Sequence, residues 1–200
     1  MNTKLFSKNY MLLIVCMMFA TTSFLRAQTL KINPRTSTMT ILGTTNVHDF
    51  ETKVTQISGE LVINSSKKVE SLNVLVPVKS IKSKEKLMDT KTYEAFSATK
   101  NPNISFHLTD ATSLKVTGQD IEVTVTGNLT MAGATRRISF KTTGKNTKAG
   151  VYEFKGSVPL KMTDFKMSPP TAMMGMMKVG DGIVLQYHVF LEGSTEIGAL

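Results

Sequence analysis

The chain has 200 residues, of which 41% are hydrophobic and 20% charged, and this balance is typical of a globular protein rather than a disordered one. Its single cysteine, Cys16, excludes an intrachain disulfide framework and any zinc site built from several cysteines. The net charge of +9 is basic, but the basic residues are not interleaved with aromatic ones, so we expect no nucleic-acid partner.

The first 27 residues have the pattern of a secretory signal peptide. Lys4 and Lys8 precede an uncharged apolar run over residues 11–20, and Ala27 offers a small residue for cleavage. The run is shorter than the roughly 20 apolar residues that a membrane-spanning helix needs, so an uncleaved anchor is the less favoured alternative. We therefore predict a signal peptide over residues 1–27.

Cleavage there determines what the mature chain contains. Removal of residues 1–27 takes away three basic residues and the cysteine, so the net charge falls from +9 to +6 and thiol chemistry is excluded. Two basic groups remain, one over residues 79–91 and one at Arg136 and Arg137. We predict a solvated face for them, with attraction to anionic headgroups as the alternative. The sequence predicts one domain over residues 28–200, in the periplasm or otherwise secreted, and the oligomeric state stays open.

Beyond the leader, apolar residues alternate with polar ones, which is the period of half-buried strands. Glycines at positions 43, 59, 127 and 156 fall inside these runs and indicate bulges or bends. Turn-forming segments near Gly118, Gly133 and Gly150 separate closely spaced strands, which favours an antiparallel barrel or sandwich. In chain order, the clearest alternations lie at residues 74–78, 104–108, 121–131, 152–160 and 183–191.

One segment, residues 83–96, breaks the alternation. Leu87, Met88 and Tyr93 are mixed with good helix formers, and Pro102 ends any helix before the next strand. We predict one or two short helices that lie across an end of the barrel.

Catalytic motifs are scarce. His48 and Asp49 are adjacent, but neighbouring strand residues point to opposite faces. His107 and His188 alternate with apolar residues and read as ordinary strand histidines. The sequence contains no nucleophile elbow, no H-E-x-x-H motif and no P-loop. We therefore predict that the protein is not an enzyme and uses neither a metal nor another cofactor.

Four methionines, Met173, Met174, Met176 and Met177, surround Gly175. Methionine is flexible and apolar, so we favour a lipid-facing flap at the mouth of a cavity. Thioether sulfurs also suit Cu(I), and a copper-handling loop is one alternative. Simple packing is the other.

Five segments taken together resemble the YceI-like family of periplasmic lipid- and polyisoprenoid-binding proteins. They are residues 30–37, 43–50 (GTTNVHDF), 81–106, 127–135 (GNLTMAGAT) and 165–181. The chain departs from the family pattern where many members carry histidines. Asn33, Thr36 and Ser37 replace the opening motif, and Ala132 replaces a hairpin histidine. Roles of those histidines therefore do not transfer, and His48 is the motif histidine that remains.

The resemblance implies an extended, lipocalin-like antiparallel β-barrel that sequesters or carries an elongated apolar ligand: a polyisoprenoid, an isoprenoid quinone or a fatty-acyl lipid. A structural or stress-related adaptor without lipid is the alternative. We also expect transient contact with a membrane surface, and His48, Arg136 and Arg137 are candidates for polar contacts to a lipid head. By their strand faces, the residues expected to line an apolar tunnel are Val74, Val76, Val78, Phe96, Ile104, Phe106, Val123, Val125, Leu129, Phe140, Phe154, Leu185 and Tyr187.

Overall fold

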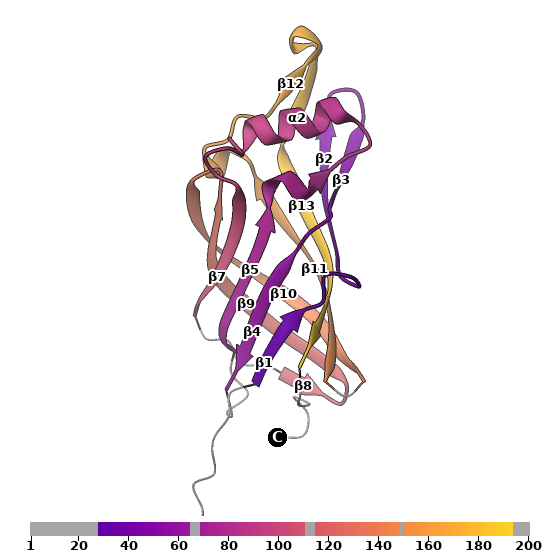
Figure 1. Cartoon of the computed structure of the whole chain (residues 1–200), viewed down its shortest axis with the longest axis vertical. Coiled ribbons are helices and arrows are strands. Elements are labelled where there is room, and N and C mark those ends of the chain that lie inside the picture. The colour runs from indigo at the N-terminus through magenta and orange to yellow at the C-terminus, as the bar shows by residue number, and fades with distance from the viewer. Residues whose placement is uncertain (1–27, 65–68, 111–114, 149, 194–200) are drawn as a thin grey trace, which may run out of the picture.

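The computed structural model describes residues 28–64, 69–110, 115–148 and 150–193, so the signal peptide predicted over residues 1–27 lies outside the described residues. The chain folds into an antiparallel β-barrel with one α-helix across one end (Figure 1). This confirms the predicted all-β, lipocalin-like barrel with a short helix. The strands are β1 (Gln28–Ile32), β2 (Thr38–Thr45), β3 (Asp49–Val54), β4 (Ser58–Ile63), β5 (Val69–Pro77), β6 (Ile81–Lys82), β7 (Asn103–Asp110), β8 (Lys115–Thr117), β9 (Asp120–Met131), β10 (Ala134–Lys148), β11 (Val151–Lys161), β12 (Thr171–Ala172) and β13 (Met177–Glu192). The helix is α2 (Lys86–Ala95), and the 3-10 turns are η1 (Val78–Ser80), η2 (Thr163–Phe165) and η3 (Met173–Gly175).

The barrel wall consists, in the described part of the chain, of eight antiparallel segments. β1 and β2 form one segment because both pair with β13, with Ile32 opposite Leu191 and Leu42 opposite Val184. β3 continues into β4 and β5 into β6, since β4 pairs with β1 and β5 while β3 pairs with β2 and β6. β7, β9, β10, β11 and β13 complete the circuit, which leaves no long unpaired edge.

The alternation in the sequence explains which side of each strand faces inward. In β9, Ile121, Val123 and Val125 are buried, whereas Glu122 and Thr124 between them are exposed. The period of two therefore places the apolar side chains in the barrel and the polar ones in solvent. Among the described residues, no helix is both long enough and apolar enough to cross a bilayer.

The glycines inside the strands mark irregular pairing at some positions and make room for side chains at others. The register of β7 against β9 shifts directly beside Gly127, and that of β13 against β2 shifts beside Gly43, as predicted, whereas pairing continues through Gly156 without a shift. A Cβ on Gly127 would come within 2.5 Å of the Phe106 ring, and one on Gly156 within 2.2 Å of the Tyr187 hydroxyl oxygen. Each glycine therefore leaves the space in which an inward-facing aromatic ring lies.

One part of the wall is not fully paired. β9 pairs with β10 along the whole length of β9, but β10 meets β11 only from Thr143, opposite Lys155, down to Lys148, opposite Val151. Above that point β10 and β11 form no ladder with each other. η2 contacts both strands there, and the Arg136 Nε donates to the Asp164 carbonyl oxygen at 2.6 Å. The upper parts of β10 and β11 are thus joined by η2 and the Arg136 side chain instead of by backbone hydrogen bonds.

Candidate ligand-binding cavity

The inward faces of the strands enclose an apolar cavity of about 140 Å³. Its lining includes six residue steps of β13, from Leu185 to Leu191, which at roughly 3.3 Å per residue span about 20 Å of strand. Apart from Thr142 and Tyr187, every lining side chain is a hydrocarbon or a thioether. Of the residues predicted to line a tunnel, nine do so: Val74, Phe106, Val123, Val125, Leu129, Phe140, Phe154, Leu185 and Tyr187.

Twelve further lining residues were not among those predicted. Several of them lie on the same strand face as predicted neighbours, as Ile138 does with Phe140. The alternation therefore contained the information needed to find them. Thr142 lies on the same face of the strand but is polar, so the alternation of apolar residues does not identify it as a lining residue. The twelve are Ile32, Met39, Ile57, Leu61, Val69, Leu72, Ile138, Thr142, Val158, Leu160, Val189 and Leu191.

Three aromatic rings form a continuous contact along one side of the cavity. The Phe106 and Phe140 ring centroids are 5.7 Å apart, and those of Phe140 and Tyr187 are 6.2 Å apart, both in edge-to-face geometry. Such pairs restrict one another's rotation, so they give this wall a defined shape.

The Tyr187 hydroxyl is a polar group in these apolar surroundings. Burial raises the pKa of this phenol, and the nearby Thr142 hydroxyl offsets the rise only in part. Within the described residues the Tyr187 oxygen has no partner at hydrogen-bond geometry, and the Thr142 hydroxyl donates instead to the Lys155 carbonyl oxygen at 3.1 Å. Tyr187 is therefore neutral at ordinary pH and contributes mainly its ring to the cavity.

The remaining predicted residues lie above the cavity rather than along it. Val76 and Met131 each follow a lining residue two positions earlier on the same strand, towards the end where α2 lies, and Met162 follows the lining residue Leu160 just past the end of β11. They are buried, and together with neighbouring side chains they close that end. We call this set the upper layer: Val76, Val78, Ile81, Phe96, Met131, Met162, Phe165 and Met167. Ile104 is half-buried against the same core and does not line the cavity.

The opposite end is closed by a second set of side chains, the lower layer, which comprises Leu30, Ile63, Ile121 and Tyr152. All four are fully or almost fully buried. Each lies two residues beyond a lining residue in the direction away from α2, for example Tyr152 before Phe154. The cavity therefore lies between two packed layers.

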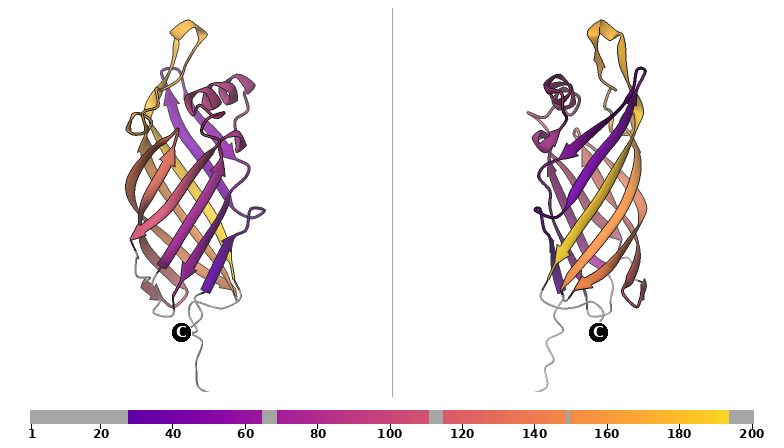
Figure 2. Two further views of the ribbon diagram at one scale, coloured as in Figure 1. Left: turned by 60° about the vertical axis from the view of Figure 1, so that its left-hand side comes forward. Right: turned by 90° about the vertical axis from the view of Figure 1, so that its right-hand side faces the viewer.

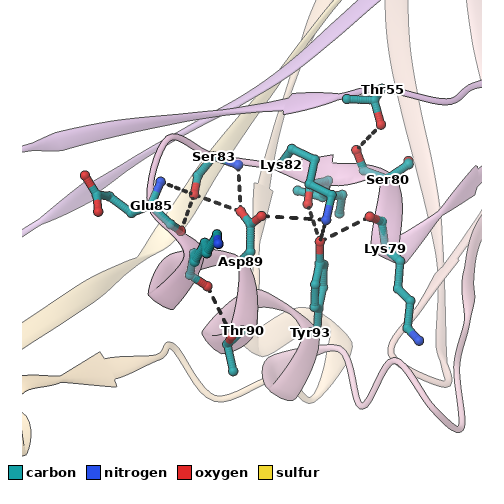
Figure 3. Close-up of polar contacts among 11 residues, drawn as sticks. Thr55, Lys79, Ser80, Lys82, Ser83, Glu85, Asp89, Thr90 and Tyr93 are labelled. Atoms are coloured by element: carbon teal, nitrogen blue, oxygen red, sulfur yellow. Dashed lines mark hydrogen bonds and ion pairs between the residues drawn. The ribbon is translucent and has the colours of Figure 1, made fainter.

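The helix α2 covers the upper layer but contributes no buried residue of its own. Polar contacts hold it in place (Figure 3). The Tyr93 hydroxyl accepts from Lys82 Nζ at 2.7 Å and can donate to the Ile81 carbonyl oxygen at 3.0 Å. Asp89 accepts from the Ser83 backbone N–H at 2.7 Å and lies 3.7 Å from Lys82 Nζ. Tyr93 first, and Asp89 to a smaller extent, raise the pKa of Lys82, which remains a cation.

The three candidate polar head contacts lie in different places. His48 is exposed on the β2–β3 turn, and its Nδ1 contacts the Asp49 carbonyl oxygen at 2.9 Å. Arg137 forms an ion pair with Asp110 on the outer face. Arg136 lies directly opposite Leu129, a lining residue, so its side chain starts on the inner face before its exposed guanidinium reaches η2. Arg136 is thus the candidate nearest to the cavity.

The methionine run lies outside the cavity. Met173, Met174 and Met176 are exposed, and Met177 is half-buried. They belong to a hairpin of β12, η3 and the start of β13, which projects beyond α2 (Figure 2). The structure therefore does not bring these side chains to the cavity wall. In the described part of the chain, His, Cys, Asp and Glu form no group of three that could hold a metal ion.

Comparison with known proteins places this architecture in a family. A search of curated proteins finds no match. Among solved structures, BcnA of Burkholderia cenocepacia has a TM-score of 0.63 at 18% identity, over 80% of this chain and 98% of that one. A polyisoprenoid-binding domain from Saccharophagus degradans gives 0.64 at 11% identity, over 82% and 98%. A Campylobacter jejuni YCEI protein gives 0.57 at 20% identity, over 72% and 85%. These likenesses show the shared barrel fold. The model of the YceI-like domain matches residues 30–191, and the chain therefore belongs to the YceI-like family.

Proposed function

We propose that this protein is exported, binds one elongated apolar ligand inside its barrel and has no enzymatic activity. The apolar cavity between the two packed layers is the observation that carries this proposal. A sugar or peptide would leave its polar groups without hydrogen bonds there, whereas a hydrocarbon chain loses nothing on entry. The similar structure from Saccharophagus degradans, described as a polyisoprenoid-binding domain, supports the same class of ligand.

The size of the cavity indicates how a ligand enters. A volume of about 140 Å³ is close to that of an engineered protein cavity that holds benzene, and below the 300–1,000 Å³ common for small-molecule sites. A longer chain therefore needs more room, which it would gain by displacing one of the packed layers. Met131, Met162 and Met167 make the upper layer the adaptable one, because unbranched thioether side chains repack easily.

The free energy of burial sets the expected affinity. Ten buried methylenes are worth roughly 8 kcal/mol, from which association removes at least about 4 kcal/mol. The remainder corresponds to a dissociation constant of about 1 mM, so useful affinity requires a longer tail or a contact to the head. Arg136 is placed for that contact, because it lies beside Leu129 where β10 and β11 separate. A polyprenyl phosphate or another lipid with an anionic head fits this arrangement.

The test of ligand binding is organic extraction of the purified protein followed by mass spectrometry. We expect about one equivalent of an apolar lipid in the unmodified protein. Val123→Phe fills the cavity and should abolish co-purification, whereas Thr124→Phe, outward on the same strand, should not. A folded Val123→Phe protein that carries as much lipid as the unmodified one contradicts the proposal. Protein that never carries lipid supports the adaptor alternative instead.

The head contact has its own test. Arg136→Gln should weaken binding of a long-chain phosphate about tenfold and leave the corresponding neutral alcohol unaffected, since charge-assisted hydrogen bonds are the strong ones. Arg137→Gln, one residue away on the outer face, is the control. Equal losses in the two variants would remove Arg136 from the site.

Export is tested by N-terminal sequencing of protein isolated from its own cell. We expect the mature chain to begin near Gln28. An intact Met1 would contradict the signal peptide.

A further inference from the structure

Exposed apolar side chains gather at one end of the barrel. In the described part of the chain, six large hydrophobic residues are exposed, and five of them belong to three neighbouring elements at the α2 end. Val47 lies on the β2–β3 turn, Leu87 on the first turn of α2, and Met173, Met174 and Met176 on the projecting hairpin (Figure 1). We call these three methionines the methionine tip; Met173 is 61% exposed, Met176 72%, and Met174 fully exposed. The sixth residue, Leu75, lies on β5 in the barrel wall.

The methionine tip is held in a defined position. Asn46, on the β2–β3 turn, donates from Nδ2 to the Met176 carbonyl oxygen at 2.9 Å and accepts at Oδ1 from the Lys178 N–H at 2.8 Å. Its own backbone N–H donates to the Lys178 carbonyl oxygen at 3.1 Å. Met173 and Met174 both have positive φ, a conformation that non-glycine residues keep only when their surroundings impose it. A hairpin tied in this way keeps its apolar side chains in solvent instead of folding them onto the barrel.

Exposed lysines flank the hairpin and the first turn of α2, while the exposed Asp49 lies two residues after Val47. Lys166 and Lys178 bracket the hairpin, and the segment between them contains no acidic residue. Lys84 and Lys86 adjoin Leu87, with Glu85 as the one acid between them. All four lysines are exposed, and within the described residues none of them forms an ion pair.

We propose that this end of the barrel docks on the surface of an anionic lipid bilayer, with the methionine tip in the outer part of the acyl region and the lysines against the headgroups. Apolar side chains flanked by cations are the combination that binds such surfaces, because burial and electrostatic attraction act together. Flexible methionines adapt to the irregular packing of lipids. Docking does not depend on the ligand proposed for the cavity, although it places the adaptable upper layer next to the membrane.

The chain contains no tryptophan, so a single introduced tryptophan reports its own surroundings. In Met174→Trp protein, we expect a blue shift of emission with vesicles of phosphatidylglycerol and phosphatidylethanolamine, and none with pure phosphatidylcholine. Leu75→Trp is the matched control and should show no shift with either kind of vesicle. A shift at position 75 equal to that at position 174, or no shift at position 174, would overturn the proposal.

Co-sedimentation with the same anionic vesicles shows whether the methionine tip binds through its apolar surface or through its sulfur atoms. A triple variant with serine at 173, 174 and 176 should bind about tenfold more weakly, whereas the triple leucine variant should bind as the unmodified protein does. Raising the salt concentration should weaken binding in both the unmodified protein and the leucine variant, because exposed charges are screened. Loss of binding in the leucine variant, or full binding in the serine variant, would refute the docking.

Discussion

The two ends of the barrel are closed by different means. At the lower end Leu30, Ile63 and Tyr152 are packed as tightly as any residue in the core. At the upper end a helix without a buried residue is held by the polar contacts of Tyr93 and Asp89 over a layer rich in methionine. Tight apolar packing resists opening, while exposed polar contacts exchange readily with water. We therefore expect the lower end to carry more of the stability of the fold and the upper end to open more readily to a ligand.

The largest expected effect is on stability and comes from the lower end. Tyr152→Ala should lower the free energy of unfolding by about 3–5 kcal/mol, as removal of a fully buried aromatic ring does. Leu87→Ala on the exposed face of α2 should change it by less than about 0.5 kcal/mol. Urea denaturation of both variants measures the contrast, and similar losses would mean that the two ends do not differ.

The methionines of the upper layer provide the second test. Met131→Leu, Met162→Leu and Met167→Leu conserve volume, so each should cost less than about 1.5 kcal/mol of stability. Branched leucine repacks less easily than methionine, so exchange of a fluorescent fatty acid should become slower in the triple variant. Unchanged exchange kinetics would show that ligand does not pass this layer.

A smaller effect should follow from the contacts of α2. Tyr93→Phe removes the hydroxyl that joins Lys82 to the Ile81 carbonyl, which should cost about 1 kcal/mol. Because the lost bond is local, hydrogen exchange should become faster in α2 and stay unchanged around Tyr152. Lipid exchange should become faster in the same variant; if it does not, α2 does not control access.

The smallest effect concerns acid pH. Hydrogen bonds from the Thr163 hydroxyl and backbone N–H lower the pKa of Asp181 below its usual 3.8, and they connect η2 to β13. Since the folded pKa is the lower one, this stabilisation is present above the unfolded pKa of 3.8 and is lost as the pH falls through the folded pKa. NMR titration should show resonances around η2 shifting with Asp181 while those of the lower layer do not. Asp181→Asn should abolish this titration.

The sequence predicts inward faces better than positions along the barrel axis. The alternation in β9 identified Val123, Val125 and Leu129 correctly, because burial on one face requires a period of two. The same reasoning failed for Val76 and Val78, which have the right face but lie above the cavity. The position of a residue along the barrel axis depends on strand register and on where the packed layers begin. The period of the apolar residues contains no information about either.

The methionine run shows a second limit. The sequence predicted a flap at the mouth of a cavity, and the structure places these methionines on a hairpin at one end of the barrel but outside the cavity. The direction of this hairpin could not be predicted, because that depends on Asn46, more than 120 residues away in the chain, and its bonds to Met176 and Lys178. Arg136 was among the predicted head contacts, but its place on the inner face opposite Leu129 could not be predicted, since a charged residue there appears in the sequence as a break in the pattern.

The central claim is that the barrel interior holds one elongated apolar ligand. A crystal structure of the protein with the lipid that co-purifies with it tests this claim most directly. We predict continuous density for a hydrocarbon chain against Phe106, Val125 and Leu185, with side chains of the upper layer displaced and the lower layer unchanged. Protein that carries one equivalent of lipid but shows density for it only outside the barrel, around an empty cavity of about 140 Å³, would contradict the claim.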